Sequence, residues 1–158
     1  MREHSQDQNT NVEDVVALLG LVGTLSIEFF EVSAKRSAAA DAVPDGEEIT
    51  AAPDFSLTIN RRPDDLVIRL KVEFETRLGL IVVDAGAIYE LPSKWTVPQS
   101  VAFEFANKVG VMALIPYIRE AVHSITIKVF GNGLVMPVIR TGELEFFESE
   151  IVDSETVI

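Results

Sequence analysis

The pattern of apolar and polar positions changes its period along the chain, and each change predicts a different element. Over residues 66–75 apolar residues alternate with charged ones, which predicts a strand with one buried and one solvated face. Residues 55–60 alternate in the same way. Residues 80–91 are almost continuously apolar, which favours an interior strand or one covered on both sides. Short connections predict that these three strands are antiparallel neighbours.

A further strand is predicted upstream, over residues 25–36, which are rich in β-branched and aromatic side chains. Adjacent Phe29 and Phe30 interrupt its alternation, which indicates either coverage of both faces or a β-bulge. Residues 12–21 have helical apolar spacing with Asn11 as N-cap, so a short N-terminal helix is expected.

The main helical region begins after the fourth strand. Thr96 and Gln99 have the spacing of a capping box, which predicts a helix start near Val97. The helix that follows has a narrow polar sector, so we expect it to be extensively buried. Pro116 predicts a kink or a second helix, and two helical pieces fit better than one rod.

The segments around these elements have other compositions. Residues 37–54 contain an alanine run and two prolines and are predicted to form a loop. Glycines at 131 and 133 end the helical region, and residues 134–139 are expected to be extended. The fold class is therefore α+β: a four-stranded, mostly antiparallel sheet packed with a long or kinked helix, plus the short N-terminal helix. We expect a disordered N-terminus over 1–11, a single domain over 12–147 and an acidic disordered tail over 148–158.

Composition limits the classes of function. Thirteen basic and 25 acidic residues give a net charge of −12, which argues against nucleic acid and anionic lipid as partners. Apolar residues make up 47% of the chain, which excludes wholesale disorder, but their runs are too short or interrupted to cross a bilayer. A chain both acidic and apolar either assembles through apolar surface or exposes some of it to a partner. The N-terminal residues do not resemble a secretion signal, so a cytoplasmic protein is expected.

Candidate chemistry is sparse. The absence of cysteine excludes disulfides, thiol nucleophiles and thiolate metal sites. His4 lies in the polar start and His123 on a helix, without a pattern that marks a nucleophile or a metal site. Paired Glu47 and Glu48 lie in the predicted loop, a poor place to hold catalytic geometry. We therefore expect a protein that is not an enzyme, with no catalytic residues, no metal and no cofactor.

One motif is specific. Residues 114–120 read LIPYIRE and resemble the signature on the main helix of the SecB family of protein-export chaperones. The order of elements also agrees: four strands, a helical lead-in, the motif helix, a glycine-containing turn and an apolar segment containing Pro137. The N-terminal helix is more similar to SecB-like chaperones of actinobacteria, including those associated with toxin–antitoxin systems. Motif residues expected to be structural are Leu114, Pro116, Tyr117, Arg119 and Glu120.

The resemblance implies an ATP-independent holdase that binds unfolded client proteins or preproteins, for protein export or for protection of an antitoxin. It also implies a homo-oligomer, a dimer of dimers, without membrane insertion. Where the family continues into a closing helix, this chain has residues 138–142 reading VIRTG, so that helix is expected to be short or missing.

Site predictions follow from the same resemblance. Client binding needs apolar surface beside the predicted loop, near the start of the main helix and in the extended segment; Met there is an adaptable contact. The candidates are Phe29, Val32, Trp95, Leu134, Val135, Met136 and Ile139. Asp84 aligns with the acidic patch on which export chaperones dock the translocase motor ATPase, although an edge-strand charge that prevents aggregation explains it equally.

Two other classes of function stay open. One is a small-ligand-binding or hotdog-like enzyme domain in which a helix wraps a curved sheet. The other is a structural oligomerisation module, which predicts no client binding at all.

Overall fold

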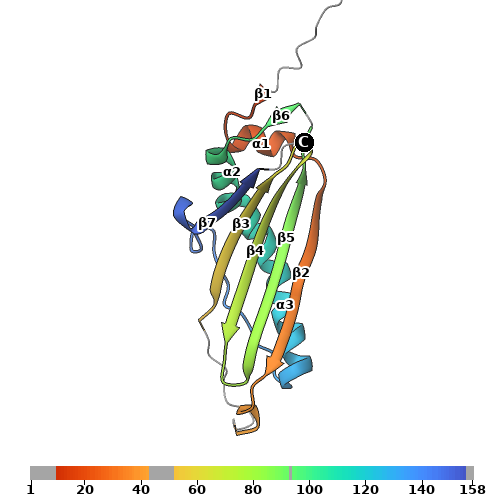
Figure 1. Cartoon of the computed structure of the whole chain (residues 1–158), viewed down its shortest axis with the longest axis vertical. Helices are drawn as coiled ribbons and strands as arrows, with labels where there is room; N and C mark the ends of the chain where they lie inside the picture. Colours follow the sequence, from red (N-terminus) through yellow and green to blue (C-terminus); the bar gives the residue numbers. More distant parts are fainter. Residues whose placement is uncertain (1–9, 43–51, 93, 156–158) are drawn as a thin grey trace, which may run out of the picture.

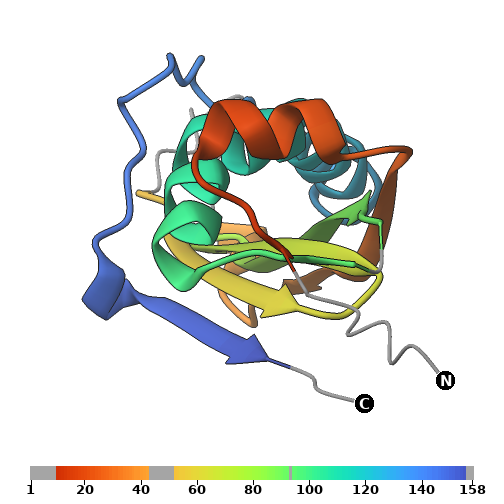
Figure 2. The same cartoon turned by 90° about the horizontal axis from the view of Figure 1, so that it is seen from above.

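The computed structural model describes residues 10–42, 52–92 and 94–155. A five-stranded sheet of order β2-β5-β4-β3-β7 is covered on one face by helices (Figures 1 and 2). Neighbouring strands are antiparallel except β3 and β7, which are parallel. The strands are β2 (Leu25–Arg36), β3 (Asp54–Arg61), β4 (Asp65–Glu75), β5 (Gly79–Glu90) and β7 (Ile151–Glu155). The predicted α+β class and its four antiparallel strands are confirmed.

Apolar and charged residues alternate along β4, so one face of the sheet is buried and the other faces solvent. Leu66, Ile68, Leu70, Val72 and Phe74 are buried beneath the helices, whereas Arg69, Lys71 and Glu73 lie on the opposite face, called here the outer face. β5 lies between β2 and β4 and is buried on both faces over most of its length, as its continuous apolar sequence predicts.

β2 contains the predicted irregularity. Phe29 pairs with Ala85 and Glu31 pairs with Asp84, so Phe30 is an extra residue and forms a bulge. Of the two explanations offered by the sequence, the bulge is correct. As a result, Phe29 and Val32 point toward the helices although they are three positions apart.

The helical layer runs without a break from α2 (Gln99–Phe105) through a π-helical turn η2 (Ala106–Gly110) into α3 (Val111–Phe130). The prediction of two pieces divided at Pro116 is wrong, because Pro116 lies inside α3 and the irregular turn comes earlier. A Cβ at Gly110 would lie 2.5 Å from Ile68 Cδ1, so glycine allows this turn to approach β4 closely. The capping box is also wrong: the N-cap is Pro98, without a side-chain hydrogen bond.

The combined helix Gln99–Phe130 is long and apolar enough to be compared with a membrane span. Its buried residues, however, pack against β5, β2 and β4, which is the arrangement of a core helix in a sheet protein.

Short elements close the upper end of the sheet in Figure 1. Helix α1 (Val15–Leu21) is capped by the Asp14 side chain, which accepts from the Ala17 amide, so the predicted cap at Asn11 is wrong. β1 (Thr10–Asn11) pairs with β6 (Trp95–Thr96), so the end of the predicted disordered N-terminus is ordered; residues 1–9 lie outside the described residues. In the predicted loop, η1 (Ala40–Ala42) is described, and residues 43–51 are not.

The chain after α3 departs most from expectation. Residues 134–147 contain no regular element, so the closing helix is missing over this stretch. Residues 148–155 of the predicted disordered tail are ordered: η3 (Glu148–Glu150) leads into β7, which adds a fifth strand beside β3. Residues 156–158 lie outside the described residues. We call residues 134–155 the C-terminal strap, and Figure 2 shows it passing around the outside of the helices.

Candidate functional site

Exposed apolar side chains collect where β2 and α3 meet. Paired residues of antiparallel strands share a face, so Leu25, Phe29 and Val32 face the helical layer, like their buried partners on β5. Phe29 and Val32 nevertheless retain 45% and 41% exposure. Tyr117 and Ile127 on α3 are also exposed. We call these five residues the β2–α3 surface.

One hydrogen bond fixes how β2 and α3 lie along each other. The Arg36 guanidinium, at the end of β2, donates to the Val129 carbonyl near the end of α3 at 3.1 Å. A strand rises about 3.3 Å per residue and a helix about 1.5 Å, so Val32 lies roughly level with the middle of α3. By the same measure Leu25 lies beyond the start of α3, so the β2–α3 surface is spread along the whole edge of the sheet.

The strap is attached to α3 and η2 by two polar side chains. Buried Thr126 accepts a 2.8 Å hydrogen bond from the Leu134 amide. The side-chain amide of Asn107 donates through Nδ2 to the Phe146 backbone carbonyl at 3.0 Å, and its Oδ1 accepts from the Phe146 backbone N–H at 2.8 Å. The side chain thus pairs with both backbone groups of Phe146, as a neighbouring strand would. Asn107 lies in the π-helical turn, a kind of distortion often associated with function.

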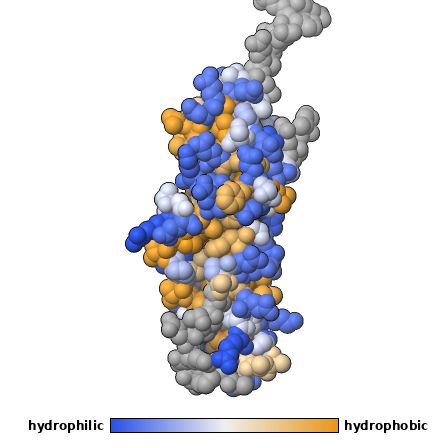
Figure 3. Space-filling model, turned by 90° about the vertical axis from the view of Figure 1, so that its left-hand side faces the viewer, coloured by the Kyte–Doolittle hydropathy of each residue, from blue (hydrophilic) through white to orange (hydrophobic). Residues whose placement is uncertain are grey.

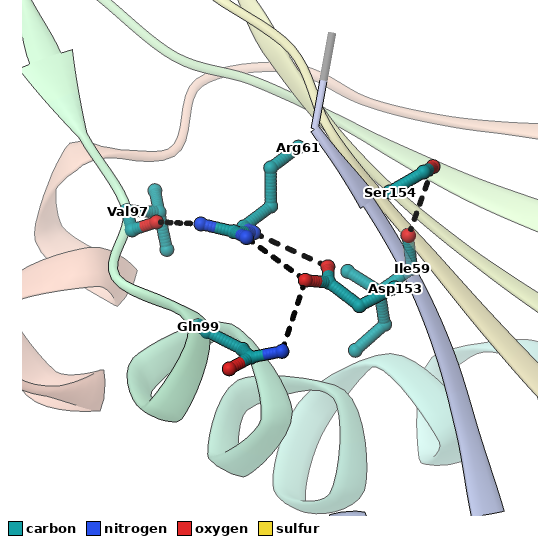
Figure 4. A network of polar contacts seen from close by, with 6 residues as sticks. All are labelled: Ile59, Arg61, Val97, Gln99, Asp153 and Ser154. Carbon is teal, nitrogen blue, oxygen red and sulfur yellow. Dashed lines mark hydrogen bonds and ion pairs between the residues drawn. The ribbon is translucent and has the colours of Figure 1, made fainter.

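The third attachment holds β7 (Figure 4). Arg61 donates through Nε and Nη2 to both carboxylate oxygens of Asp153, at 3.2 and 2.8 Å, and its Nη1 donates to the Val97 carbonyl. Gln99, at the start of α2, donates to the same carboxylate. Both charged side chains are largely buried, so this bidentate pair has a stronger orienting effect than a surface ion pair.

Exposed apolar residues also follow the strap. Val135 and Val138 are exposed, and Phe147 and Val152 are 71% and 65% exposed. Figure 3, which faces the side of the molecule where β7 lies, shows apolar surface broken by polar side chains. The strap thus presents apolar side chains within an acidic segment.

The seven residues predicted for client binding are divided by the structure. Phe29 and Val32 lie together on the β2–α3 surface, and Val135 is exposed on the strap. Leu134 and Met136 are buried in the core, where in this conformation no partner reaches them. Trp95 on β6 and Ile139 are partly buried against the core.

Asp84 occupies a different environment from either one expected. It lies on β5, an interior strand, so the explanation as an edge-strand charge is wrong. Asp84 is 5% exposed, and its carboxylate accepts two 2.8 Å hydrogen bonds from Arg69, which raise the pKa of the Arg69 guanidinium. Arg69 in turn stacks on the ring of Phe30, 4.0 Å from its centroid. Any partner that docked on Asp84 would have to displace Arg69.

Phe30 itself fits closely onto the outer face. A Cβ at residue 86 would lie 2.6 Å from its ring, so glycine at that position makes room for the bulged aromatic side chain. The outer face therefore carries a cation–aromatic–carboxylate cluster, in which Phe30 stays 45% exposed, instead of an open acidic patch.

The motif residues of α3 differ in their exposure. Leu114 is fully buried, whereas Pro116, Tyr117 and Glu120 are exposed and Arg119 is partly buried. The exposed His123 ring lies against Gly133, where the chain leaves the helix. Among the described residues, His, Asp and Glu side chains form no group of three suited to a metal ion.

No protein-family model matches the sequence. The chain is, however, 33% identical over 146 residues to the SecB-like chaperone SmegB of Mycolicibacterium smegmatis, and the match covers 91% of this chain and 93% of that relative. The chain belongs to the SecB-like chaperones. It is accordingly a holdase-type chaperone, which points away from an enzyme.

The fold agrees with this SecB-like assignment. The Mycobacterium tuberculosis SecB-like chaperone Rv1957, solved in complex with a ChAD peptide from the HigA1 antitoxin Rv1956, superposes with a TM-score of 0.68. The two sequences are 17% identical, and the match covers 78% of this chain and 94% of that one. The resemblance drawn from residues 114–120 is thus confirmed at the level of family and fold.

Sequence reasoning missed the polar attachments of this SecB-like strap. Arg61, Asn107 and Asp153 are far apart in the chain, and none belongs to a recognisable motif. The one available signal was the alternation of Ile151 and Asp153 with exposed residues, typical of a half-buried strand, but the surrounding acids favoured a disordered tail.

Proposed function

We propose that this SecB-like chaperone is a cytoplasmic homo-oligomer that holds extended apolar segments of non-native polypeptides without ATP. The observation that carries the proposal is the amount of exposed apolar surface in a chain of net charge −12. Apolar side chains bind unfolded segments of varied sequence, and the acidic surroundings keep the loaded complex soluble.

The β2–α3 surface is assigned to a second copy of the chain. No strand among the described residues pairs with the outer edge of β2, although β2 is one of the two longest strands. Such an edge, bordered by exposed Phe29 and Val32, needs a cover in a stable protein. Antiparallel pairing of β2 with its copy would supply one, and a second apolar contact through α3 would give a dimer of dimers. Phe29 and Val32 are then assembly residues and not client contacts.

The strap is assigned to clients. Val135 and Val138 are exposed on it, while neighbouring Leu134 and Met136 anchor it to the core. The two anchors hold the segment against the core and leave Val135 and Val138 available to an extended polypeptide.

An antitoxin is proposed among the clients, because the structural relative was solved with an antitoxin peptide. Export through the translocase motor is less favoured, since Asp84 is sequestered by Arg69.

The test is suppression of the aggregation of denatured citrate synthase without nucleotide, with oligomer mass measured on the same sample. We expect stoichiometric suppression by a tetramer. Val138→Asp should weaken it, whereas Val16→Asp, an equally apolar and exposed position on α1, should leave it unchanged. Unchanged aggregation at several-fold molar excess would contradict the proposal and favour an oligomerisation module; saturable binding of a small metabolite would favour the ligand-binding alternative.

A further inference from the structure

β7 is attached to the sheet in a way that differs from every other strand. It is the parallel member of an otherwise antiparallel sheet, and parallel pairing is slightly weaker per residue. It reaches β3 only after the irregular segment that follows α3, so the contact with β3 is not imposed by a tight turn.

The side chains of β7 bury little apolar surface. From 151 to 154, only Ile151 is buried, and Val152 and Ser154 are exposed. The remaining attachment is polar: Asp153 binds Arg61 and Gln99, and the Ser154 hydroxyl lies 3.5 Å from the Ile59 carbonyl (Figure 4). Segments with few buried apolar contacts open at a small fraction of the free energy of global unfolding.

The edge of β3 beneath β7 has its own specificity. Leu57, which pairs with Ile151, lies on the buried face, and Arg61 at the end of the strand points its guanidinium toward position 153. A strand added here therefore needs an apolar residue and, two positions later, a carboxylate.

We propose that β7 is a displaceable resident strand, and that the edge of β3 is a client-binding edge for extended acidic segments with this apolar-x-carboxylate spacing. The client segment would run parallel to β3, with its carboxylate on Arg61 and its backbone in the ladder that β7 leaves. This inference deepens the proposed holdase function and rests on it. β7 then acts as an internal competitor that keeps the edge covered when no client is bound.

The natural chain has no cysteine, so one disulfide can lock β7 without side reactions. Thr58 and Val152 are paired residues on the outer face, and Thr58→Cys with Val152→Cys gives a variant that is locked when oxidised and free when reduced. Asp153→Lys should release β7 from β3, because it places a second cation beside Arg61. Glu13→Lys, an exposed position just before α1 with the same charge change and outside the strap, is the control.

Two probes are used by fluorescence anisotropy: reduced carboxymethylated α-lactalbumin, and a labelled peptide with the sequence of residues 147–155. We expect the oxidised variant to bind both at least tenfold more weakly than the reduced one, and Asp153→Lys to bind the peptide at least tenfold more tightly than the parent. Replacing aspartate by lysine within the peptide should abolish that gain.

Equal affinity of the oxidised and reduced forms for both probes would overturn the inference and leave the holdase function intact. The inference would also be overturned if the disulfide weakened binding of the peptide but not of α-lactalbumin. The β3 edge would then bind only the sequence of β7 and not a client. If the parent and all variants fail to bind α-lactalbumin, the proposed function fails instead.

Discussion

The two edges of the sheet are treated in opposite ways. At one edge, β2 is long, bulged and bordered by exposed apolar residues, and no described strand covers it. At the other edge, β3 is covered by β7, a strand from the same chain held by Arg61 and Asp153. An open edge recruits other chains, and a covered edge excludes them until the cover leaves. Under the two proposals above, assembly and client capture are divided between opposite sides of one small sheet.

The largest expected effect comes from uncovering the β3 edge. Asp153→Lys removes a largely buried ion pair and leaves Arg61 facing a like charge, which should lower the free energy of unfolding by about 3 kcal/mol. Urea denaturation measures that loss, and hydrogen exchange should show faster exchange of the β3 amides. Exchange confined to other strands would contradict the role of the pair in holding β7. Glu13→Lys, the control before α1, should change neither result.

A charge placed beside the opposite edge, on β2, should have the next largest effect. Val32→Asp puts a charge into the surface proposed to meet a second copy, and burying it there should weaken self-association by about tenfold to a hundredfold. Sedimentation velocity over a concentration series measures the change. Val16→Asp should keep the mass of the parent, and retention of that mass by Val32→Asp would show that assembly uses another surface.

A smaller change should loosen the strap without freeing β7. Asn107→Ala removes both hydrogen bonds to the Phe146 backbone and should cost about 1–2 kcal/mol. Limited proteolysis should then cleave near residue 146 sooner than in the parent. Asn132→Ala, an exposed asparagine beyond α3, should leave the cleavage rate unchanged; equal rates in both variants would mean that Asn107 does not hold the strap.

The smallest effect is expected between the edges, at Tyr89 on β5. Burial raises its pKa, its ring packs edge-on against Phe105, and its hydroxyl lacks a partner among the described residues. Tyr89→Phe should therefore be neutral or stabilising by about 1 kcal/mol near neutral pH.

The same residue predicts an alkaline limit. The unfolded chain loses the tyrosine proton near pH 10, before the folded protein does, so the contribution of Tyr89 to stability is complete below about pH 10 and falls as pH rises through the higher folded value. Urea midpoints above pH 10 should fall less in Tyr89→Phe than in the parent. Identical pH profiles would contradict burial of the neutral phenol.

The success of the sequence prediction followed the range of the interactions. The four long strands and the end of the helical region depend on neighbouring residues, and local patterning found them. The same patterning located an irregularity at Phe29 and Phe30 but did not choose between a bulge and coverage of both faces. The cap of α1 was misjudged, since Asp14 and not Asn11 caps the helix. The continuity of α3 through Pro116 was also misjudged, because tertiary packing of a nearly all-apolar helix outweighs the one hydrogen bond that proline cannot donate.

The site was harder to predict, because it depends on distant partners. Leu134 and Met136 have the composition of a client surface, yet they are buried, and only the path of the strap over α3 decides this. In the sequence Asp84 resembles an exposed acid, but in the structure it is paired with Arg69, fifteen positions earlier in the chain. Pairings that join segments so far apart leave no local periodicity to detect.

The bulge in β2 has a consequence for the chaperone's own solubility. On either side of Phe30 the strand follows a regular ladder, over Leu25–Phe29 and over Glu31–Arg36, but the two ladders are out of step by one residue. A straight strand that met this edge would match only one of them, so fibril growth by repeated in-register stacking is interrupted at the first layer. A protein that handles aggregation-prone chains thereby avoids serving as a template for them.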